Sequence, residues 1–549
     1  MKLIGFVGAL LAVSGCHHAA DPCAPPETPD DRAAPPARHT PRWAFEPWIS
    51  KDISDTDDTY AFVDGFASRD IPVGVVVLDS PWETHYNTFV PNPTRYHDFA
   101  KLLADLHGRD IRLVLWITQM VNNYGMDFET GGDTYSGESP NFEEGLKCKY
   151  YVDEGDTYVW WKGTGAGVDF FNPHARSWWH RQQDAILDRG IDGWKLDFGE
   201  NYILSTTLDT AAGPKPKQEY SEAYYRDYLA YGVARRGAEF LTMTRGWDES
   251  YQFVGRFYAR PEDTRVVWAG DNRRDWVGLA DALNTMFKSA RAGYVVVGSD
   301  IGGYLDFDDK TNVTVPASQT TFARWTAIGA LSPFMQLHGR ANLTPWTVEE
   351  RPDETVTLYR YWAKLHHELV PFFYSLTEEA YAGGAALLDP VGDEASWAGD
   401  FRYTLGGVLL VAPILDDSGV RDVALPAGAR WYDWWASDTT PPIDGGTTLA
   451  QYDATDRSRV PLFVRQGAIL PMRSSIRVWP GADPTTFVVH DEDGATTQID
   501  AQAAPDGASA TVTLSRVLAA TELQVRLPAG GTQVVAVAAS AGPQTFQVP

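Results

Sequence analysis

Short apolar runs alternate with amphipathic stretches from about residue 43 to residue 377. The amphipathic stretches, such as Tyr96–Leu106 and Ser177–Leu187, have apolar residues three and four positions apart, which is the spacing of one helix face. The apolar runs that predict strands are Trp43–Ile49, Val73–Leu78, Arg112–Ile117, Gly193–Leu196, Phe240–Met243, Val266–Trp268, Tyr294–Val297 and Phe334–Leu337. Eight strands that alternate with helices predict an α/β fold of the (β/α)8 TIM barrel type over residues 43–377.

From about residue 378 the helical spacing gives way to short β-rich runs separated by Gly, Pro and Asp. These runs are Arg402–Leu405, Val408–Val411, Val423–Leu425, Leu462–Val464, Thr485–His490, Ala510–Leu514 and Gln524–Leu527. The pattern is typical of β-sandwiches. We therefore expect a proximal C-terminal β-sandwich over residues 378–465 and a distal β-rich domain over residues 466–549.

The first residues have the pattern of an export signal. An apolar run, Leu3–Val13, follows Lys2 and is too short to span a membrane. It leads into a stretch that resembles a bacterial lipobox, in which the signal is cut before a cysteine that is then lipidated; here that residue is Cys16. We expect a lipoprotein signal peptide over residues 1–15 and lipidation of Cys16, with an ordinary signal peptide as the alternative. His17 stands where an inner-membrane retention signal has Asp, so the expected location is the outer membrane of a bacterial envelope.

Residues 16–42 are rich in Pro, Asp and Ala and show no apolar period, which is the composition of an extended tether. Apart from Cys16 the chain has two cysteines, Cys23 and Cys148, which could pair in an exported protein. Because Cys23 lies in the predicted tether, the sequence does not place it beside Cys148. The pairing therefore stays open at this point.

Charge and composition narrow the class of ligand. The formal net charge of −27 disfavours nucleic acid as a partner, because nucleic acid requires a basic surface, and favours a neutral substrate over a phosphorylated one. The chain has 20 Trp and 25 Tyr, and flat aromatic rings suit the C–H faces of sugars, although large cores also use them. The acidic segments 55–58 and 306–309 lack the spacing of a calcium loop. We expect no metal and no cofactor.

Polar and aromatic residues recur at the ends of the predicted strands. They are Asp79, Trp116, Asp197, Arg245, Asp271, Asp300 and His338. In a (β/α)8 barrel these ends converge on one face, where the active site forms. A single acidic residue after a strand is usually a helix cap, but this number of residues in the same register predicts a site.

Several segments, in order, resemble those of glycoside hydrolase family 31. Gly190–Glu200 contains the Lys-x-Asp-Phe-Gly-Glu sequence of the nucleophile strand in the branch that includes α-xylosidases, and Val267–Asn272 is similar to the acid/base strand. Further similar segments are Gly298–Gly303, Phe334–Gly339 with Pro345-Trp346, Leu409–Ile414 and Pro461–Gly467. The resemblance covers roughly residues 43–472.

The resemblance implies a role for each residue. Asp197 corresponds to the nucleophile and Asp271 to the acid/base, with Asp275 as the next candidate for the latter. The residues that match substrate-binding positions are Asp79, Trp116, Lys195, Arg245, Trp268, Asp300 and His338. For Asp300 and His338 the alternative is a buried structural pair.

The implied function is that of a retaining, exo-acting α-glycosidase, which hydrolyses a terminal α-linked sugar of an oligosaccharide or glycoside by double displacement. Xylose, glucose and galactose stay open as the sugar, and the oligomeric state is open. A transglycosylase with the same mechanism is one alternative, and a catalytically silent carbohydrate-binding lipoprotein on the same scaffold is another.

Relatives usually carry a β-sandwich ahead of the barrel that reaches the mouth of the active site. In this sequence only the predicted tether precedes Trp43. We expect the polar, aromatic-rich insert at about residues 123–169, which contains Trp160 and Trp161, to replace that wall.

Overall fold

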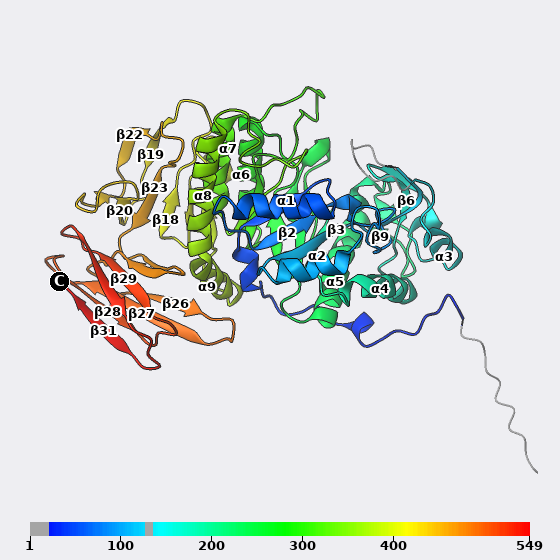
Figure 1. Ribbon diagram of the computed structural model, residues 1–549, viewed down its shortest axis with the longest axis horizontal. Helices are drawn as coiled ribbons and strands as arrows, with labels where there is room; N and C mark the ends of the chain where they lie inside the picture. Colours follow the sequence, from blue (N-terminus) through cyan, green and yellow to red (C-terminus); the bar gives the residue numbers. More distant parts are fainter. Residues whose placement is uncertain (1–20, 127–135) are drawn as a thin grey trace, which may run out of the picture.

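The computed structural model describes residues 21–126 and 136–549 (Figure 1). Its centre is a closed barrel of eight parallel strands, which confirms the predicted TIM barrel. The strands are β1 (Trp48–Lys51), β2 (Val75–Leu78), β3 (Arg112–Ile117), β7 (Gly193–Leu196), β10 (Leu241–Arg245), β13 (Val266–Trp268), β14 (Val297–Ile301) and β15 (Phe334–Leu337). The helices around them are α1 (Thr56–Ala67), α2 (Phe99–His107), α4 (Pro173–Leu187), α5 (Lys217–Arg236), α6 (Trp276–Arg291), α7 (Gln319–Ala330), α8 (Pro352–Glu368) and α9 (Val370–Tyr381).

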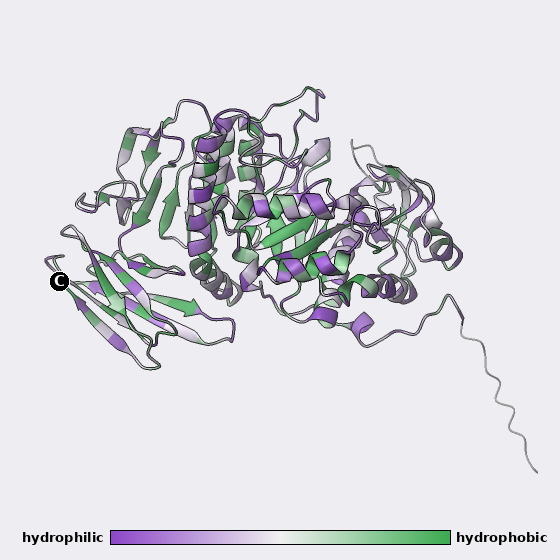
Figure 2. Ribbon diagram, viewed as in Figure 1, coloured by the Kyte–Doolittle hydropathy of each residue, from purple (hydrophilic) through white to green (hydrophobic). Residues whose placement is uncertain are grey.

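Local sequence explains these elements. The strands are buried on both faces, and β2 is a run of Val and Leu without solvent exposure. Aspartate side chains cap the helices: Asp55 accepts from the Asp58 amide at the start of α1, and Asp98 accepts from the Lys101 amide at the start of α2. Figure 2 shows the hydrophobic strands at the centre and hydrophilic residues on the helices that surround them.

The seventh barrel strand differs from the prediction. We expected it at Tyr294–Val297, whereas β14 begins at Val297 and ends at Ile301. Ser299 and Asp300 therefore lie inside the strand, where Ser299 accepts a hydrogen bond from Trp325 at 2.9 Å. These polar residues are paired by side chains from elsewhere in the chain, so hydrophobicity alone misplaced the strand.

The insert after β3 forms a small sheet of its own. Its strands are β4 (Met120–Gly125), β5 (Tyr158–Trp160) and β6 (Gly163–Gly167), and α3 (Phe142–Lys147) lies beside them. Gly163 has a φ of +129°, and a Cβ there would lie 2.1 Å from the Tyr124 carbonyl oxygen, so only glycine fits between the strands.

Residues 21–42, predicted to be a free tether, are bound to the barrel, and we call them the N-terminal strap. Cys23 forms a disulfide with Cys148 of the insert, which settles the open pairing. Asp31 is buried and its carboxylate lies 2.6 Å from Nδ1 of His180 in α4. The strap runs below α4 and α5 in Figure 1. The composition of residues 21–42 did not indicate this packing. The strap is held by a disulfide and by single polar contacts, and its sequence has no apolar periodicity that would predict a packed segment. Cys16 lies outside the described residues.

The region after the barrel is β-rich, and its strands form two groups of sheets. The proximal part has a sheet of β16 (Leu388–Pro390), β17 (Tyr403–Leu405), β18 (Leu409–Val411), β23 (Leu462–Arg465), β20 (Arg430–Asp433) and β21 (Ile443–Asp444), with β19 (Val420–Ala424) paired to β22 (Thr448–Asp453). The distal part has two sheets, β24 (Ile469–Pro471) with β25 (Ser475–Val478), β29 (Thr521–Arg526) and β30 (Thr532–Val537), and β26 (Thr485–His490) with β27 (Thr496–Ala503), β28 (Ala510–Leu514) and β31 (Gln544–Val548). Within the described residues, none of the helices has the length and apolar character required to cross a bilayer.

Candidate active site

A pocket of about 250 Å³ lies at the carboxyl ends of the barrel strands. Five of the predicted residues line it: Asp79, Lys195, Asp197, Asp271 and His338. The other predicted residues of the barrel lie behind these side chains and contact them: Trp116, Arg245, Trp268 and Asp300. The barrel therefore brings all the predicted residues of this face together.

Arg245 joins the two central carboxylates. Its Nη2 atom donates to Oδ1 of Asp197 at 2.9 Å and to Oδ1 of Asp271 at 3.1 Å. Its Nε atom also donates to Asp197, at 3.1 Å. The side chain is fully buried, and its guanidinium lies 3.7 Å from the ring centroid of Phe198 and 4.5 Å from that of Trp268. The aromatic rings of Phe198 and Trp268 therefore hold the guanidinium in place, and its hydrogen bonds fix the positions of the two carboxylates relative to each other.

Asp197 follows β7 and is held at both oxygens. Oδ2 accepts from Trp116 Nε1 at 3.0 Å, and Oδ1 accepts from the backbone N–H of Phe198 at 2.9 Å in addition to the Arg245 bonds. A carboxylate that accepts this many hydrogen bonds is stabilised in its charged form. One orientation of the side chain is fixed before any ligand binds.

The two carboxylates differ in protonation. Burial would raise the pKa of Asp197, but the positive charges of Arg245 and Lys195 outweigh burial and lower the pKa below its usual value. Burial raises the pKa of Asp271 to about 6, because Arg245 does not offset the combined effect of burial and of the negative charges of Asp197 and Asp248. Near pH 5 the site therefore holds one ionised carboxylate and one carboxylic acid.

A second polar cluster lies beside these carboxylates. Lys195 Nζ donates to Asp79 at 2.7 Å and lies 3.5 Å from Nδ1 of His338. Nδ1 of His338 also lies 3.4 Å from Asp300, whose other oxygen accepts from Gln336 at 2.5 Å. These groups present a cation, carboxylates and an imidazole to one side of the pocket, a suitable set for sugar hydroxyls.

Several lining residues were not predicted as site residues. They are Trp161, Lys162, Phe198, Tyr202, Tyr251, Tyr304, Phe307 and Arg340. Phe198 and Tyr202 follow the β7 end and Arg340 follows the β15 end, so the strand-end register was a usable signal for them. Tyr251 and Phe307 lie on loops whose sequences carry no such signal. Trp161 and Lys162 show that the insert contributes to the wall of the pocket.

Asp275 does not belong to the pocket. Its carboxylate accepts from the Gly278 amide at 2.9 Å, which makes it the cap of α6, and forms an ion pair with Arg273 at 2.7 Å. It was named as the next acid/base candidate, and this placement removes it. The sequence alone could not distinguish Asp275 from Asp271, because both are aspartates that closely follow the same strand and a helix-capping aspartate has no sequence mark of its own.

A paired carboxylate and carboxylic acid at the carboxyl ends of a (β/α)8 barrel is the arrangement that glycoside hydrolases use to cleave glycosidic bonds. The comparison with known families agrees. Residues 37–376 match the family 31 glycosyl hydrolase TIM-barrel domain, and residues 375–470 match the family 31 C-terminal domain. The chain belongs to glycoside hydrolase family 31.

Individual relatives are distant. α-Glucosidase 2 of Bacillus thermoamyloliquefaciens is 26% identical over 502 residues, which span 83% of this chain and 58% of the relative. An α-xylosidase of Emericella nidulans is 26% identical over 454 residues, 79% of this chain and 53% of the relative. The chain thus spans little more than half the length of these relatives.

Solved structures share the fold. The cycloalternan-forming enzyme from Listeria monocytogenes superposes with a TM-score of 0.78 at 19% identity, over 93% of this chain and 55% of that one. A Flavobacterium johnsoniae dextranase of the same family gives a TM-score of 0.76 at 17% identity, over 93% of this chain and 71% of that one.

Proposed function

We propose that this protein is a retaining, exo-acting α-glycosidase, with Asp197 as the nucleophile and Asp271 as the acid/base. The observation that carries the proposal is the bridge through Arg245. Because Nη2 lies 2.9 Å from one Oδ1 and 3.1 Å from the other, the two oxygens are at most about 6 Å apart. Retaining glycosidases separate their carboxyl groups by roughly 5–5.5 Å, and inverting ones by roughly 6.5–9.5 Å to admit a water molecule. The separation supports the retaining mechanism.

The protonation states suit the two steps. In the first step Asp197 attacks the anomeric carbon, Asp271 gives its proton to the departing oxygen, and the alcohol leaves as a glycosyl ester forms on Asp197. In the second step water attacks the anomeric carbon of this ester while Asp271 takes a proton from the water, the bond between the anomeric carbon and Asp197 breaks, and the free sugar leaves with Asp197 ionised again. Arg245 contacts both carboxylates and counters the charge that alternates between them.

The proposal of exo action rests on a pocket of about 250 Å³ that has room for a single sugar ring. A neighbouring pocket of about 410 Å³ shares Asp271 with it and offers space for the departing group. Asp79, Lys195 and His338 line the pocket and offer hydrogen-bond partners to the hydroxyls of that ring.

The candidate sugars are xylose, glucose and galactose. The named relatives include both an α-glucosidase and an α-xylosidase, so an activity assay has to identify the sugar that this protein accepts. Hydrolysis and transfer differ only in the acceptor of the second step. Product analysis at high substrate concentration separates the two, because a transglycosylase accumulates longer oligosaccharides.

A panel of aryl α-glycosides and a mechanism-based fluorosugar test the proposal. We expect release of aryl alcohol from one α-glycoside and covalent labelling of Asp197, whereas Asp197→Ala should lose turnover and labelling while melting at nearly the same temperature. A label mapped to another residue refutes the assignment, and a chain that neither hydrolyses nor is labelled is the silent binder.

We also propose that Cys16 is lipidated and anchors the protein in the cell envelope. The lipobox-like sequence supports this, and the Cys23–Cys148 disulfide is of a kind that persists in oxidising compartments outside the cytosol. Cys16→Ser should move the protein from the membrane fraction to the soluble fraction or leave the precursor uncleaved. If the variant fractionates as the wild type does, lipidation is refuted.

A further inference from the structure

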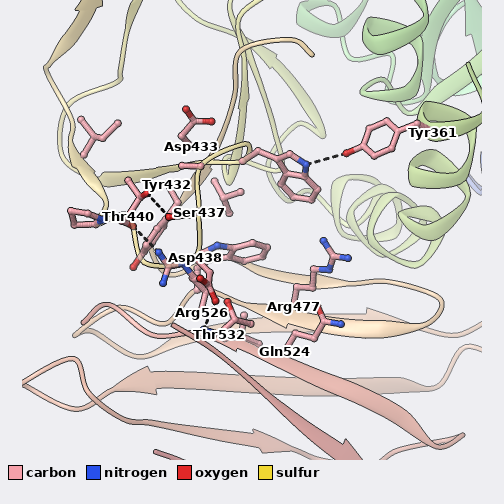
Figure 3. A pocket seen from close by; sticks show the side chains of 17 residues that line it. Tyr361, Tyr432, Asp433, Ser437, Asp438, Thr440, Arg477, Gln524, Arg526 and Thr532 are labelled. Atoms are coloured by element: carbon pink, nitrogen blue, oxygen red, sulfur yellow. Dashed lines mark hydrogen bonds between the residues drawn. The ribbon is translucent and has the colours of Figure 1, made fainter. Parts of the chain in front are cut away.

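A second pocket, of about 270 Å³, lies where the two β-rich parts and α8 meet (Figure 3). Tyr432 and Asp433 come from β20, Arg477 comes from β25, and Gln524 and Arg526 come from β29. Tyr361 of α8 closes one side, where its hydroxyl accepts from Trp434 Nε1 at 3.4 Å. None of its lining residues belongs to the active-site pocket.

The walls combine aromatic faces with hydrogen-bonding groups. The ring centroids of Trp434 and Trp479 are 6.3 Å apart with the planes tilted by 32°, and Tyr361 is 41% exposed. Such rings pack against the C–H faces of a pyranose, and their partial exposure leaves them available to a ligand. Figure 3 shows the polar groups of the proximal part facing those of the distal part across the pocket.

The charges of the pocket are balanced in an otherwise acidic chain. Asp433 and Asp438 stand against Arg477 and Arg526, although the whole chain carries a net charge of −27. Asp433 accepts from Tyr452 at 2.9 Å and Asp438 accepts from the Thr532 amide at 3.2 Å, so both acids are fixed in place. A pocket with equal numbers of cations and anions favours a neutral ligand that both donates and accepts hydrogen bonds.

Two buried polar atoms of this wall lack a partner. The hydroxyl of Tyr432, a residue that is 4% exposed, makes no hydrogen bond in the described structure, and neither does Nε of Arg477. Buried polar groups are almost always paired, and leaving them unpaired is costly. Both atoms lie beneath the surface of the pocket, and the polar groups that a sugar would contact are accessible ones such as Gln524 and Thr532.

We propose that this pocket is a non-catalytic binding site for one pyranose unit of a neutral oligosaccharide or polysaccharide. The site goes beyond the proposed glycosidase activity and does not depend on it, because the two pockets share no residue. It gives the protein a second point of attachment to a glycan chain, remote from the carboxylates.

Affinity electrophoresis tests the site, with native gels that contain dextran, soluble starch or xyloglucan as neutral probes and polygalacturonate as the anionic one. We expect at least one neutral polysaccharide to retard the wild type. The double variant Trp434→Ala/Trp479→Ala should weaken this retardation by about tenfold or more while it hydrolyses a small aryl α-glycoside at the wild-type rate. Trp435→Phe is the matched control, since Trp435 is adjacent in sequence but does not line the pocket.

Tyr361→Ala keeps the test decisive if the double variant does not fold. Tyr361 lines the pocket and is 41% exposed, so its loss should leave the fold intact and lower the affinity by about fivefold. Retardation by polygalacturonate alone, by no probe, or equally in wild type and variants overturns the proposal. A protein that binds glycan here and hydrolyses no glycoside refutes the proposed activity and leaves this site standing.

Discussion

Asp271→Ala should remove a proton donor from the pocket and leave the nucleophile in place. Asp271 shares Arg245 with Asp197, but Asp197 also accepts hydrogen bonds from Arg245 Nε, from Trp116 Nε1 and from the Phe198 amide, which remain in the variant. The variant should therefore still form the glycosyl ester when the leaving group departs without help. It should fail when the leaving oxygen has to be protonated.

The magnitude follows from the pKa of Asp271. With a pKa of about 6 instead of the usual 3.8, roughly nine-tenths of the side chain is protonated at pH 5 instead of about 6%, a gain of roughly 15-fold in the active form. General acid catalysis itself contributes about 10²–10⁴-fold. We expect kcat/KM for alkyl or sugar α-glycosides to fall by about 10²–10⁴-fold, and for α-glycosyl fluorides by far less.

The assay compares initial rates on these two substrate types, with and without azide. Azide should restore turnover of the variant and give an α-glycosyl azide, because a small anion can attack the anomeric carbon of the ester intermediate and displace Asp197 without the help of a base. Asp197→Ala is the control, which should be slow on both substrates. Equal slowing of both substrates in Asp271→Ala, without rescue by azide, would refute the assignment.

Three further predictions concern pH and stability. With Asp271 as the proposed acid, kcat/KM should fall as the pH rises through about 6. Asp248→Asn, which removes a negative charge that raises the pKa of Asp271, should move this fall to lower pH, and an unchanged profile would argue against the coupling. Cys23→Ser should lower the free energy of unfolding by about 2–4 kcal/mol in denaturant titrations, and a reductant should destabilise the wild type but not the variant. His180 lies between two aspartates that, against the effect of burial, raise its pKa to about 9, so its stabilising contribution is complete below pH 6.5 and disappears as the pH rises through 9. His180→Gln should therefore cost roughly 3 kcal/mol at pH 6 and progressively less above that pH, and a cost independent of pH would contradict the charge of the imidazole.

The sequence predicted most of the barrel because its strands are nearly pure apolar runs. Val75–Leu78 and Arg112–Ile117 were found almost residue for residue. The site residues were found for a related reason, since strand ends converge in a barrel whatever the rest of the chain does. The seventh strand was misplaced because Ser299 and Asp300 are polar and buried, and their burial depends on Trp325 and Gln336.

Contacts between residues far apart in sequence could not be predicted, because they produce no local pattern in the sequence. Asp31 and His180 meet across 149 positions, and nothing near Asp31 distinguishes it from a solvated charge. The same holds for Tyr251 and Phe307, which enter the pocket from loops. The second pocket joins residues from α8, β20, β25 and β29, so no single segment of the sequence could indicate it.

The disulfide between the N-terminal strap and the insert changes how far an anchored enzyme could reach. A free segment from Cys16 to Arg42 would extend by at most about 90 Å, at roughly 3.5 Å per residue. With Cys23 bonded to Cys148, seven residues separate Cys16 from the far end of that stretch at Cys23, and seven residues at full extension cover at most about 25 Å. That is less than the roughly 40 Å thickness of a bilayer with its headgroups. An enzyme lipidated at Cys16 would therefore lie close to the membrane surface, with the insert nearest the lipid. It would act only on sugars that come close to the membrane.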